Sequence, residues 1–342
     1  MAMNSNVTNL VQESVFVPYM HRPETYIVSG LFLIILIVGV FGNGMMMITL
    51  GADSTARNTS TVYMFSLALG DILVILTSVP LTSVIFTFDS WPWGQTVCKL
   101  SECVKDISVG VSVFTLTALS AERYYAVVNP LRRHVAGMKA VPLALLIACL
   151  IWVLAIVLSM PAALFSDVMD IDITTNSSIH ICNPFPVELG ASYRRGVVLF
   201  KFLAYYIIPL LIISVFYFQI VRHLQLSTRN MPCELSPMQR LEQIRSRRKV
   251  GKMVISIVLI FFICFLPYHI FMIWFHFFAS TLNDYNKYWH IFRIIGFVMT
   301  FINSCVNPLV LYFASTTFRV RCQHSEYFVK NQEPFPSRVD LC

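Results

Sequence analysis

The chain has 342 residues, of which 56% are hydrophobic and only 13% are charged, and its net charge is +7. Soluble domains carry about 25% charged residues, so this chain has too few charges to cover a surface exposed to water. The composition and the mean hydropathy of +0.68 exclude disordered, fibrous and small disulfide-rich proteins, and they predict an integral membrane protein.

Seven apolar segments follow one another, and a membrane-crossing helix needs about 20 mostly apolar residues. Their connections are mostly short, which predicts that neighbouring helices run antiparallel. The segments are Ile27–Leu50, Val62–Phe86, Ile107–Ala121 with its charged continuation out to Glu102, Ala140–Ser166, Gly196–Val221, Met253–Asn283 and Ile294–Thr317. We predict an all-α membrane protein with an N-terminal tail at 1–26, a seven-transmembrane helix bundle at 27–312, a short amphipathic eighth helix at 313–322 and a short tail at 323–342.

The basic residues set the orientation, because cytoplasmic loops carry an excess of Lys and Arg. With the N-terminus outside, 17 of the 25 Lys and Arg residues lie on the cytoplasmic side. This surface would face anionic lipid and a cytoplasmic partner, so the positive charge does not require nucleic acid. The glycosylation motifs at Asn6 and Asn176 then lie outside, whereas the motif at Asn58 lies inside and should stay unmodified. The first 26 residues have no apolar core, so we expect no cleavable signal peptide.

Asp71 is the only carboxylate in the middle of a predicted span. Ionisable residues inside the membrane are costly, and they are functional candidates by default. Oxygen ligands around one carboxylate suit a hard cation such as Na⁺, whereas a protonated Asp71 would serve as hydrogen-bonded structural glue. The residues alone leave these two interpretations open. Possible partners on other spans are Asn43, Ser112, Asn303, Ser304 and Asn307.

Two further patterns are weak when each is taken alone. Glu122-Arg123-Tyr124 ends the third span, and an exposed ion pair of this kind contributes little stability. Prolines kink helices, and Pro267 and Pro308 are candidate hinges, although packing kinks without motion would leave the same pattern. The prolines within the spans are Pro80, Pro161, Pro209, Pro267 and Pro308.

Taken in order, these residues resemble the rhodopsin-like (class A) G-protein-coupled receptors. The resemblance covers all seven spans, from about Ile27 to Cys322. The motifs that carry it are Gly42-Asn43, Leu67-Ala68-Leu69-Gly70-Asp71, Cys98, Glu122-Arg123-Tyr124, Trp152, Pro209, Tyr217, Phe261, Cys264-Phe265-Leu266-Pro267 and Asn307-Pro308.

Within this class the chain resembles the bombesin-receptor group, and most of all the insect CCHamide neuropeptide receptors. The passages that carry this are Glu24-Thr25-Tyr26-Ile27, Ser90-Trp91-Pro92-Trp93-Gly94, Gly110–Arg123 and Asn303–Pro308. The resemblance implies a cell-surface receptor for an amidated, CCHamide-like neuropeptide that activates a heterotrimeric G protein, with Gq and Ca²⁺ release as the expected pathway. Another bombesin- or endothelin-like peptide is the alternative ligand.

The resemblance also implies roles for individual residues. Arg123 would engage the G protein when the sixth helix swings outward, with Tyr217 supporting that state, and Phe265 stands where most relatives have Trp. The residues of coupling and switching are Glu122, Arg123, Tyr124, Tyr217, Val113, Pro209, Phe261, Phe265, Pro267 and Pro308. Cys98 and Cys182 correspond to the shared outer disulfide. An allosteric sodium site corresponds to Asp71, Ser112, Asn303, Ser304 and Asn307, which favours the ion over the protonated acid.

Two checks exclude an opsin and an aminergic receptor. The seventh span lacks the Lys that an opsin needs, and Lys105 stands where aminergic receptors carry Asp. An aromatic cavity of mixed charge suits a peptide with an aromatic or amidated end. The expected ligand-binding residues are Lys105, Asp106, Lys201, Tyr268, His269, Arg293 and Phe297, with Trp91, Trp93, Phe275, Tyr285 and Trp289 at the rim. Lys201 and Arg293 could instead snorkel to the interface, and His269 could be a satisfied polar residue within the bundle.

Other classes fit poorly. A secondary transporter would show internal repeats and more charge at mid-membrane depth, and no catalytic motif occurs in a suitable setting, so we expect neither transport nor enzyme activity. We expect no cofactor, and no metal besides sodium. Cys322 follows a basic stretch and is a candidate for palmitoylation. The tail beyond it has only Ser325, Ser337 and Tyr327 as phosphoacceptors, which weakens the case for arrestin recruitment.

Overall fold

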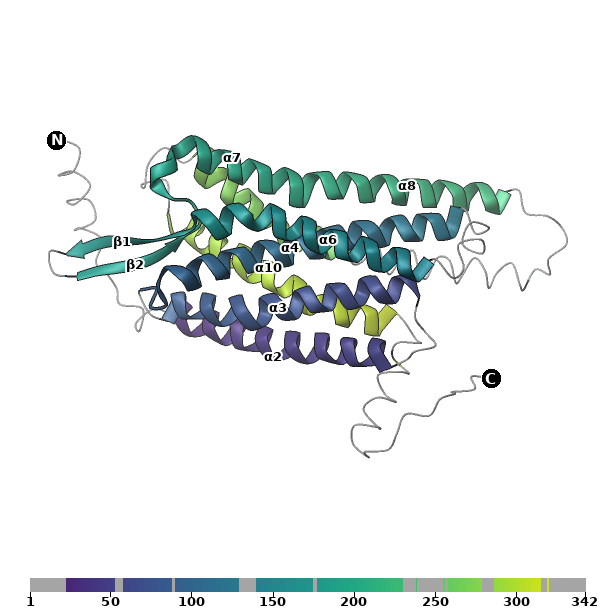
Figure 1. Ribbon diagram of the computed structural model, residues 1–342, viewed down its shortest axis with the longest axis horizontal. Helices are drawn as coiled ribbons and strands as arrows, with labels where there is room; N and C mark the ends of the chain where they lie inside the picture. Colours follow the sequence, from purple (N-terminus) through teal and green to yellow (C-terminus); the bar gives the residue numbers. More distant parts are fainter. Residues whose placement is uncertain are drawn as a thin grey trace, which may run out of the picture.

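The computed structural model describes residues 23–52, 58–87, 90–128, 140–174, 177–229, 238, 255, 258–278, 286–314 and 319. These residues form a bundle of long helices that run along the longest dimension of the molecule (Figure 1). Seven helices in the described ranges are long and apolar enough to cross a membrane. The predicted seven-helix bundle is therefore confirmed.

The first four spans are single helices, and three of them begin earlier than predicted. Asn58 caps the second helix, since its Oδ1 accepts a hydrogen bond of 2.9 Å from the Thr61 backbone N–H. The third helix begins long before Ile107, because its charged first turns lie at the end of the bundle, where Lys105 pairs with Glu102. The four helices are α2 (Pro23–Ala52), α3 (Thr59–Thr87), α4 (Gly94–Val128) and α6 (Ala140–Phe165).

The last three spans include two π-helical turns. The turn η5 ends directly before Ile208-Pro209, and it accommodates a proline ring that cannot donate a backbone hydrogen bond. The sixth span is Val258–Phe278, which ends in the second π-helical turn, η6 (Trp274–Phe278). The fifth span consists of α7 (Gly190–Phe202), η5 (Leu203–Ile207) and α8 (Ile208–Arg229), and the seventh is α10 (Lys287–Ala314).

The bundle buries polar residues and exposes apolar ones. Asn43 and Asp71 are 0% exposed, whereas Phe41 and Phe218 are 65% and 69% exposed. Lipid solvates apolar side chains as well as a protein core does, so small and polar residues gather between the helices. The exposure pattern is thus that of a membrane bundle.

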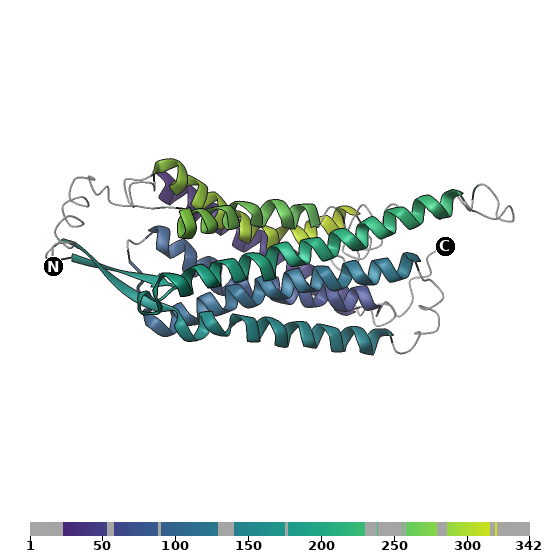
Figure 2. The ribbon, with the colours of Figure 1, turned by 90° about the horizontal axis from the view of Figure 1, so that it is seen from above.

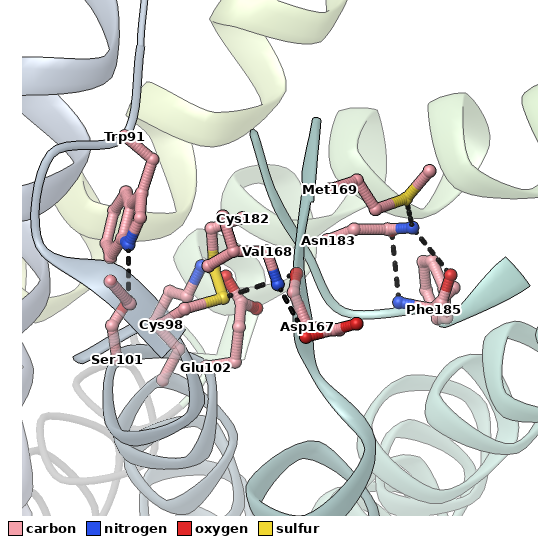
Figure 3. The surroundings of a disulfide bond; sticks show 12 residues. Trp91, Cys98, Ser101, Glu102, Asp167, Val168, Met169, Cys182, Asn183 and Phe185 are labelled. Atoms are coloured by element: carbon pink, nitrogen blue, oxygen red, sulfur yellow. Dashed lines mark hydrogen bonds and ion pairs between the residues drawn. A yellow bond between two sulfur atoms is a disulfide. The ribbon is translucent and has the colours of Figure 1, made fainter. Parts of the chain in front are cut away.

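A two-stranded hairpin follows the fourth span and projects from one end of the bundle (Figures 1 and 2). Strands β1 (Asp167–Thr174) and β2 (Ser177–Asn183) pair antiparallel, and a short turn, η4 (Val187–Leu189), leads from β2 towards α7. A disulfide joins Cys182 on β2 to Cys98 on α4, with 5.5 Å between their Cα atoms (Figure 3). We call this the hairpin end of the bundle, and the predicted disulfide is confirmed.

The hairpin is also fixed to the segment before α4. The Trp91 backbone N–H donates to the His180 carbonyl oxygen at 2.8 Å, and the His180 N–H donates to Ser90 Oγ at 2.9 Å. Beyond β2, the Asn183 side chain donates to the Phe185 carbonyl at 2.6 Å and accepts from the Phe185 N–H at 3.1 Å (Figure 3). The chain therefore turns back over the end of the helices in a fixed position.

Several predictions concern residues outside the described ranges. They are the glycosylation of Asn6 and Asn176, the palmitoylation of Cys322, the rim position of Tyr285 and all but the first part of the eighth helix at 313–322. These stay predictions.

Candidate functional site

A cavity of about 470 Å³ opens at the hairpin end. Ligand sites in proteins commonly have volumes of about 300–1,000 Å³. Its walls come from α4, the fifth and sixth spans and α10, and residues 181–185 at the end of β2 lie over it. All seven residues predicted to bind ligand line this cavity, namely Lys105, Asp106, Lys201, Tyr268, His269, Arg293 and Phe297.

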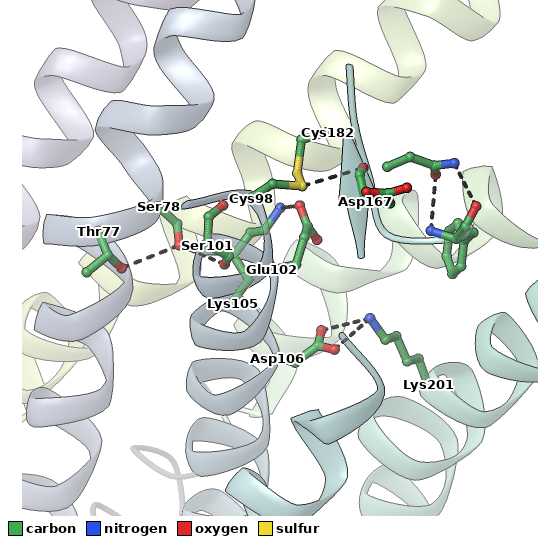
Figure 4. Close-up of polar contacts among 12 residues, drawn as sticks. Thr77, Ser78, Cys98, Ser101, Glu102, Lys105, Asp106, Asp167, Cys182 and Lys201 are labelled. Carbon is green, nitrogen blue, oxygen red and sulfur yellow. Dashed lines mark hydrogen bonds and ion pairs between the residues drawn. A yellow bond between two sulfur atoms is a disulfide. The ribbon is translucent and has the colours of Figure 1, made fainter. Parts of the chain in front are cut away.

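Two ion pairs lie in the cavity wall. Lys201 Nζ on α7 lies 2.7 Å from Asp106 Oδ2 and 2.9 Å from Asp106 Oδ1 on α4 (Figure 4). Lys105 pairs with Glu102, one turn away on the same helix. Since the ammonium of Lys201 is held by Asp106, it does not snorkel to the interface. A buried ion pair of this kind is retained only when both charges are well satisfied, and here it also joins two helices.

Arg293 is different, because it has no acidic partner among the described residues. Its guanidinium carbon lies 5.8 Å from the centroid of the Phe297 ring, at the distance of a cation–π contact. Tyr268 packs edge-on against the same ring at 5.6 Å. A Cβ on Gly296 would lie 3.0 Å from the Tyr268 backbone nitrogen, so glycine allows α10 to approach the sixth span closely at this point.

A second polar centre surrounds Asp71, which is fully buried. Asn307 Nδ2 donates to Asp71 Oδ2 at 2.8 Å, and Ser112 Oγ donates to Oδ1 at 3.4 Å. Asn43 Nδ2 donates to the Ser304 carbonyl at 2.8 Å, while Asn43 Oδ1 has no hydrogen-bond partner among the described residues. The carboxylate of Asp71 with the neighbouring hydroxyl of Ser112 and amide of Asn307 supplies hard oxygen atoms of the kind that suits a sodium ion.

The cavity reaches this second centre, since Ser112, Asn303 and Ser304 form part of its lining. Phe265 also lines the cavity, and its ring lies 4.7 Å from the ring of Phe261. Three of the predicted switch residues are buried: Phe261 is 1% exposed, Val113 is 0% exposed and Pro209 is also buried.

A third cluster lies at the opposite end of the bundle. Glu122 accepts hydrogen bonds from Ser60 Oγ at 2.8 Å and from the Thr59 hydroxyl. Arg123 Nη2 donates to the same Ser60 oxygen at 3.0 Å, and its Nε lies 3.9 Å from Glu122. The Arg123 and Glu122 side chains are only 20% and 15% exposed, so they are not the solvent-exposed pair that the triplet alone would suggest. The Ser60 hydroxyl therefore forms hydrogen bonds with both Glu122 and Arg123.

Two tyrosines lie near this cluster. The Tyr217 hydroxyl on α8 is buried and has no hydrogen-bond partner in the described part of the chain. The Tyr124 ring packs against Phe216 at 5.5 Å. The site residues predicted from the sequence thus gather in three places along one axis: the cavity, the Asp71 centre and the Arg123 cluster.

Residues 42–312 match the family described as 7 transmembrane receptor (rhodopsin family). The chain belongs to this family. It is 48% identical over 320 residues to the neuropeptide CCHamide-1 receptor of Drosophila melanogaster, an alignment that covers 92% of this chain and 63% of that protein. It is 35% identical over 313 residues to a bombesin receptor of Bombina orientalis, covering 90% of this chain and 78% of that protein. The chain thus spans less than two thirds of the CCHamide-1 receptor. Membership of a signalling-receptor family agrees with the prediction that the chain is not an enzyme.

In this rhodopsin-family receptor, three predicted rim residues do not line the cavity. Trp91 packs edge-on with Trp93 at 5.1 Å and donates from Nε1 to the Gly94 carbonyl, so it braces the turn into α4. Trp289 stacks on Trp274 at 3.7 Å. Phe275 does line the cavity. These tryptophans pack against other tryptophans outside the lining of the cavity.

Four residues that line the cavity of this receptor were not expected from the sequence. Phe185 and Asn183 follow the cysteine of β2, and only the disulfide would have placed them over the helices. Tyr205 lies on the π-helical turn η5, where helical periodicity gives the wrong face. His276 lies on η6, where the same difficulty applies. All four line the cavity.

Proposed function

We propose that this multi-pass plasma-membrane receptor binds an amidated, CCHamide-like neuropeptide on the outside of the cell and activates a heterotrimeric G protein, of the Gq class, inside. One observation carries the proposal. The cavity beneath the disulfide-held hairpin combines two ion pairs, several aromatic rings and Arg293, which has no acidic partner in the described ranges. This combination is suitable for a peptide end that carries both polar and aromatic groups. The 48% identity to a CCHamide-1 receptor supports the choice of ligand.

The orientation belongs to the same proposal. The hairpin end, with its disulfide, would face the oxidising exterior, and the N-terminus with it. The end that carries Arg123 would face the cytoplasm, where the excess of basic residues also falls. Anionic lipid headgroups would then contact the basic loops.

The three clusters suggest how binding would reach the G protein. A peptide favours whichever receptor state it binds more tightly, and it can shift the equilibrium only by that difference in affinity. Contact with Tyr268 and His269 would move the sixth span, and with it the packed rings of Phe265 and Phe261. Arg123 would then exchange its bond to Ser60 for contacts with the G protein.

The Asp71 centre would hold an allosteric sodium ion. The residues that would bind it are Asp71, Ser112, Asn303, Ser304 and Asn307. A bound Na⁺ would supply a positive charge that compensates the Asp71 carboxylate in a low-dielectric site. Independently of a bound ion, the Asn307–Asp71 hydrogen bond joins α10 to α3.

A second candidate ligand is a bombesin-like peptide, because the chain is 35% identical to a bombesin receptor over most of both chains. The test is to express the receptor in cells and apply amidated CCHamide peptides and bombesin peptides side by side while intracellular Ca²⁺ is recorded. We expect Ca²⁺ release at the lowest concentrations of a CCHamide peptide. A response to bombesin peptides alone would make a bombesin-like peptide the better candidate ligand. If neither peptide bound or gave a response, the proposal would be contradicted.

A further inference from the structure

The Lys201–Asp106 ion pair offers a hydrogen-bond donor and an acceptor side by side in the cavity wall. Both side chains line the cavity and are partly accessible, at 16% and 13% exposure. An ammonium has three N–H donors, and each carboxylate oxygen can accept more than one hydrogen bond. The two contacts between Lys201 and Asp106 therefore leave at least one N–H and several lone pairs for a third group.

Tyr205 adds an independent sign that a polar group of a ligand comes here. Its side chain lies on η5, is 2% exposed and lines the same cavity. Its hydroxyl is buried without a hydrogen-bond partner among the described residues. Asp106 and Lys201 line the same cavity. Buried hydroxyls are normally satisfied, so this one is best explained by a missing partner in the cavity.

We propose that Asp106 and Lys201 together select a neutral carboxamide over a carboxylate at the end of the ligand. This inference rests on the proposed function. A primary carboxamide has N–H donors for Asp106 and a carbonyl acceptor for Lys201, so it complements the pair without disturbing it. A carboxylate has acceptors only, and it would place a second negative charge beside Asp106 in a poorly screened cavity.

The other charged residues of the cavity do not lead to the same preference for a carboxamide. Arg293 has no acidic partner in the described part of the chain, so by itself it would favour a carboxylate. Lys105 and Glu102 satisfy each other along a single helix, one turn nearer the hairpin. Whether the receptor prefers a peptide with an amidated or an acidic C-terminus therefore shows whether the Asp106–Lys201 pair or Arg293 governs recognition.

The experiment compares one CCHamide peptide in two forms, with a C-terminal amide and with a C-terminal acid, by competition binding and Ca²⁺ release. We expect the wild-type receptor to prefer the amide by at least about tenfold, since like charges in an interface are strongly unfavourable. Asp106→Asn frees the Lys201 ammonium to attract the acid, so the amide-to-acid ratio should fall about tenfold. Lys201→Gln leaves Asp106 to repel the acid, so the ratio should rise.

These opposite directions separate selection from misfolding, which would weaken both peptides together. The matched control is Asp170→Asn, which removes an exposed carboxylate from the hairpin without touching the cavity and should leave the ratio unchanged. A double exchange, Asp106→Lys with Lys201→Asp, restores the pair and should restore the preference for the amide.

The possible failures can be told apart. Equal potency of amide and acid in the wild type would overturn the inference and leave the proposed function standing. The inference would also be overturned if Asp106→Asn left the amide-to-acid ratio unchanged, whether or not Glu102→Gln shifted that ratio. Absence of binding by both peptides would remove the proposed function and this inference with it.

Discussion

The two ends of the bundle hold their charged residues in different ways. At the hairpin end, a disulfide fixes the hairpin to α4, and Lys201 and Asp106 form a direct ion pair between two helices. At the opposite end, Arg123 donates a hydrogen bond to the Ser60 hydroxyl, which itself donates to Glu122. The first arrangement is preorganised, which reduces the entropy lost when a ligand binds. The second consists of single hydrogen bonds that a partner protein can replace with its own.

This contrast predicts which mutations should have the largest effects on binding and signalling. Removing a native disulfide commonly costs about 2–5 kcal/mol, whereas a single hydrogen bond contributes about 0.5–1.5 kcal/mol net. Changes at the hairpin end should therefore abolish binding, and changes at the opposite end should alter signalling while binding continues.

The largest effect is expected from Cys98→Ser. Without the disulfide, residues 181–185 are no longer held over the cavity, and peptide binding should fall by more than about thirtyfold. The measurement is radioligand binding at matched surface expression. Cys149→Ser removes an exposed free cysteine on α6 and serves as the control. Unchanged affinity in Cys98→Ser would show that the hairpin does not shape the site.

Arg123→Ala should come next. We expect Ca²⁺ signalling to fall by at least about tenfold while peptide binding persists, because the guanidinium lies far from the cavity and at the proposed G-protein end. Dose–response curves and binding on the same cells measure the two properties separately. Normal signalling at equal expression would refute the coupling role.

Ser60→Ala should have a smaller effect with the opposite sign. Loss of the shared hydroxyl removes one hydrogen bond from Glu122 and the Ser60 bond of Arg123, so basal signalling without peptide should rise by about two- to tenfold. Thr77→Ala on the same helix is the control, since the Thr77 hydroxyl bonds the Leu73 carbonyl within α3. Basal signalling no higher than in Thr77→Ala would mean that Ser60 does not restrain Arg123.

The smallest effect concerns the Asp71 centre, which lies between the two ends. Sodium should lower agonist affinity by about two- to fivefold in the wild type, and Asp71→Asn should remove that dependence. Binding in sodium buffer against binding in N-methylglucamine buffer of equal ionic strength measures it. An unchanged sodium response in the variant would exclude the ion from this centre.

Much of this arrangement could be predicted from the sequence. Long uncharged segments predicted the seven spans, because lipid leaves few alternatives to an apolar helix of that length. Asp71 could be identified because a charged residue in such a segment needs a specific reason, whereas Arg123 was identified only through the resemblance to the receptor family. All seven expected ligand-binding residues do line one cavity.

Other features depend on contacts that no local pattern records. The π-helical turn η5 rotates Tyr205 away from the face that regular helical periodicity gives. The partnership of Lys201 with Asp106 joins residues from α7 and α4, and the sequence alone left Lys201 open to snorkelling. The rim tryptophans were expected to face a ligand, yet Trp91 packs edge-on against Trp93 and Trp289 stacks on Trp274. Pairings across the bundle decide each of these cases.

The central claim is that the preorganised hairpin end and the loosely held Arg123 cluster are coupled. By thermodynamic reciprocity, a G protein bound near Arg123 must then tighten peptide binding in the cavity. The most direct test is the affinity of an amidated CCHamide peptide for receptor membranes with and without a non-hydrolysable GTP analogue that releases the G protein. We predict an affinity at least about fivefold lower with the analogue, and no shift in Arg123→Ala. Equal affinity in the wild type under both conditions would contradict the coupling.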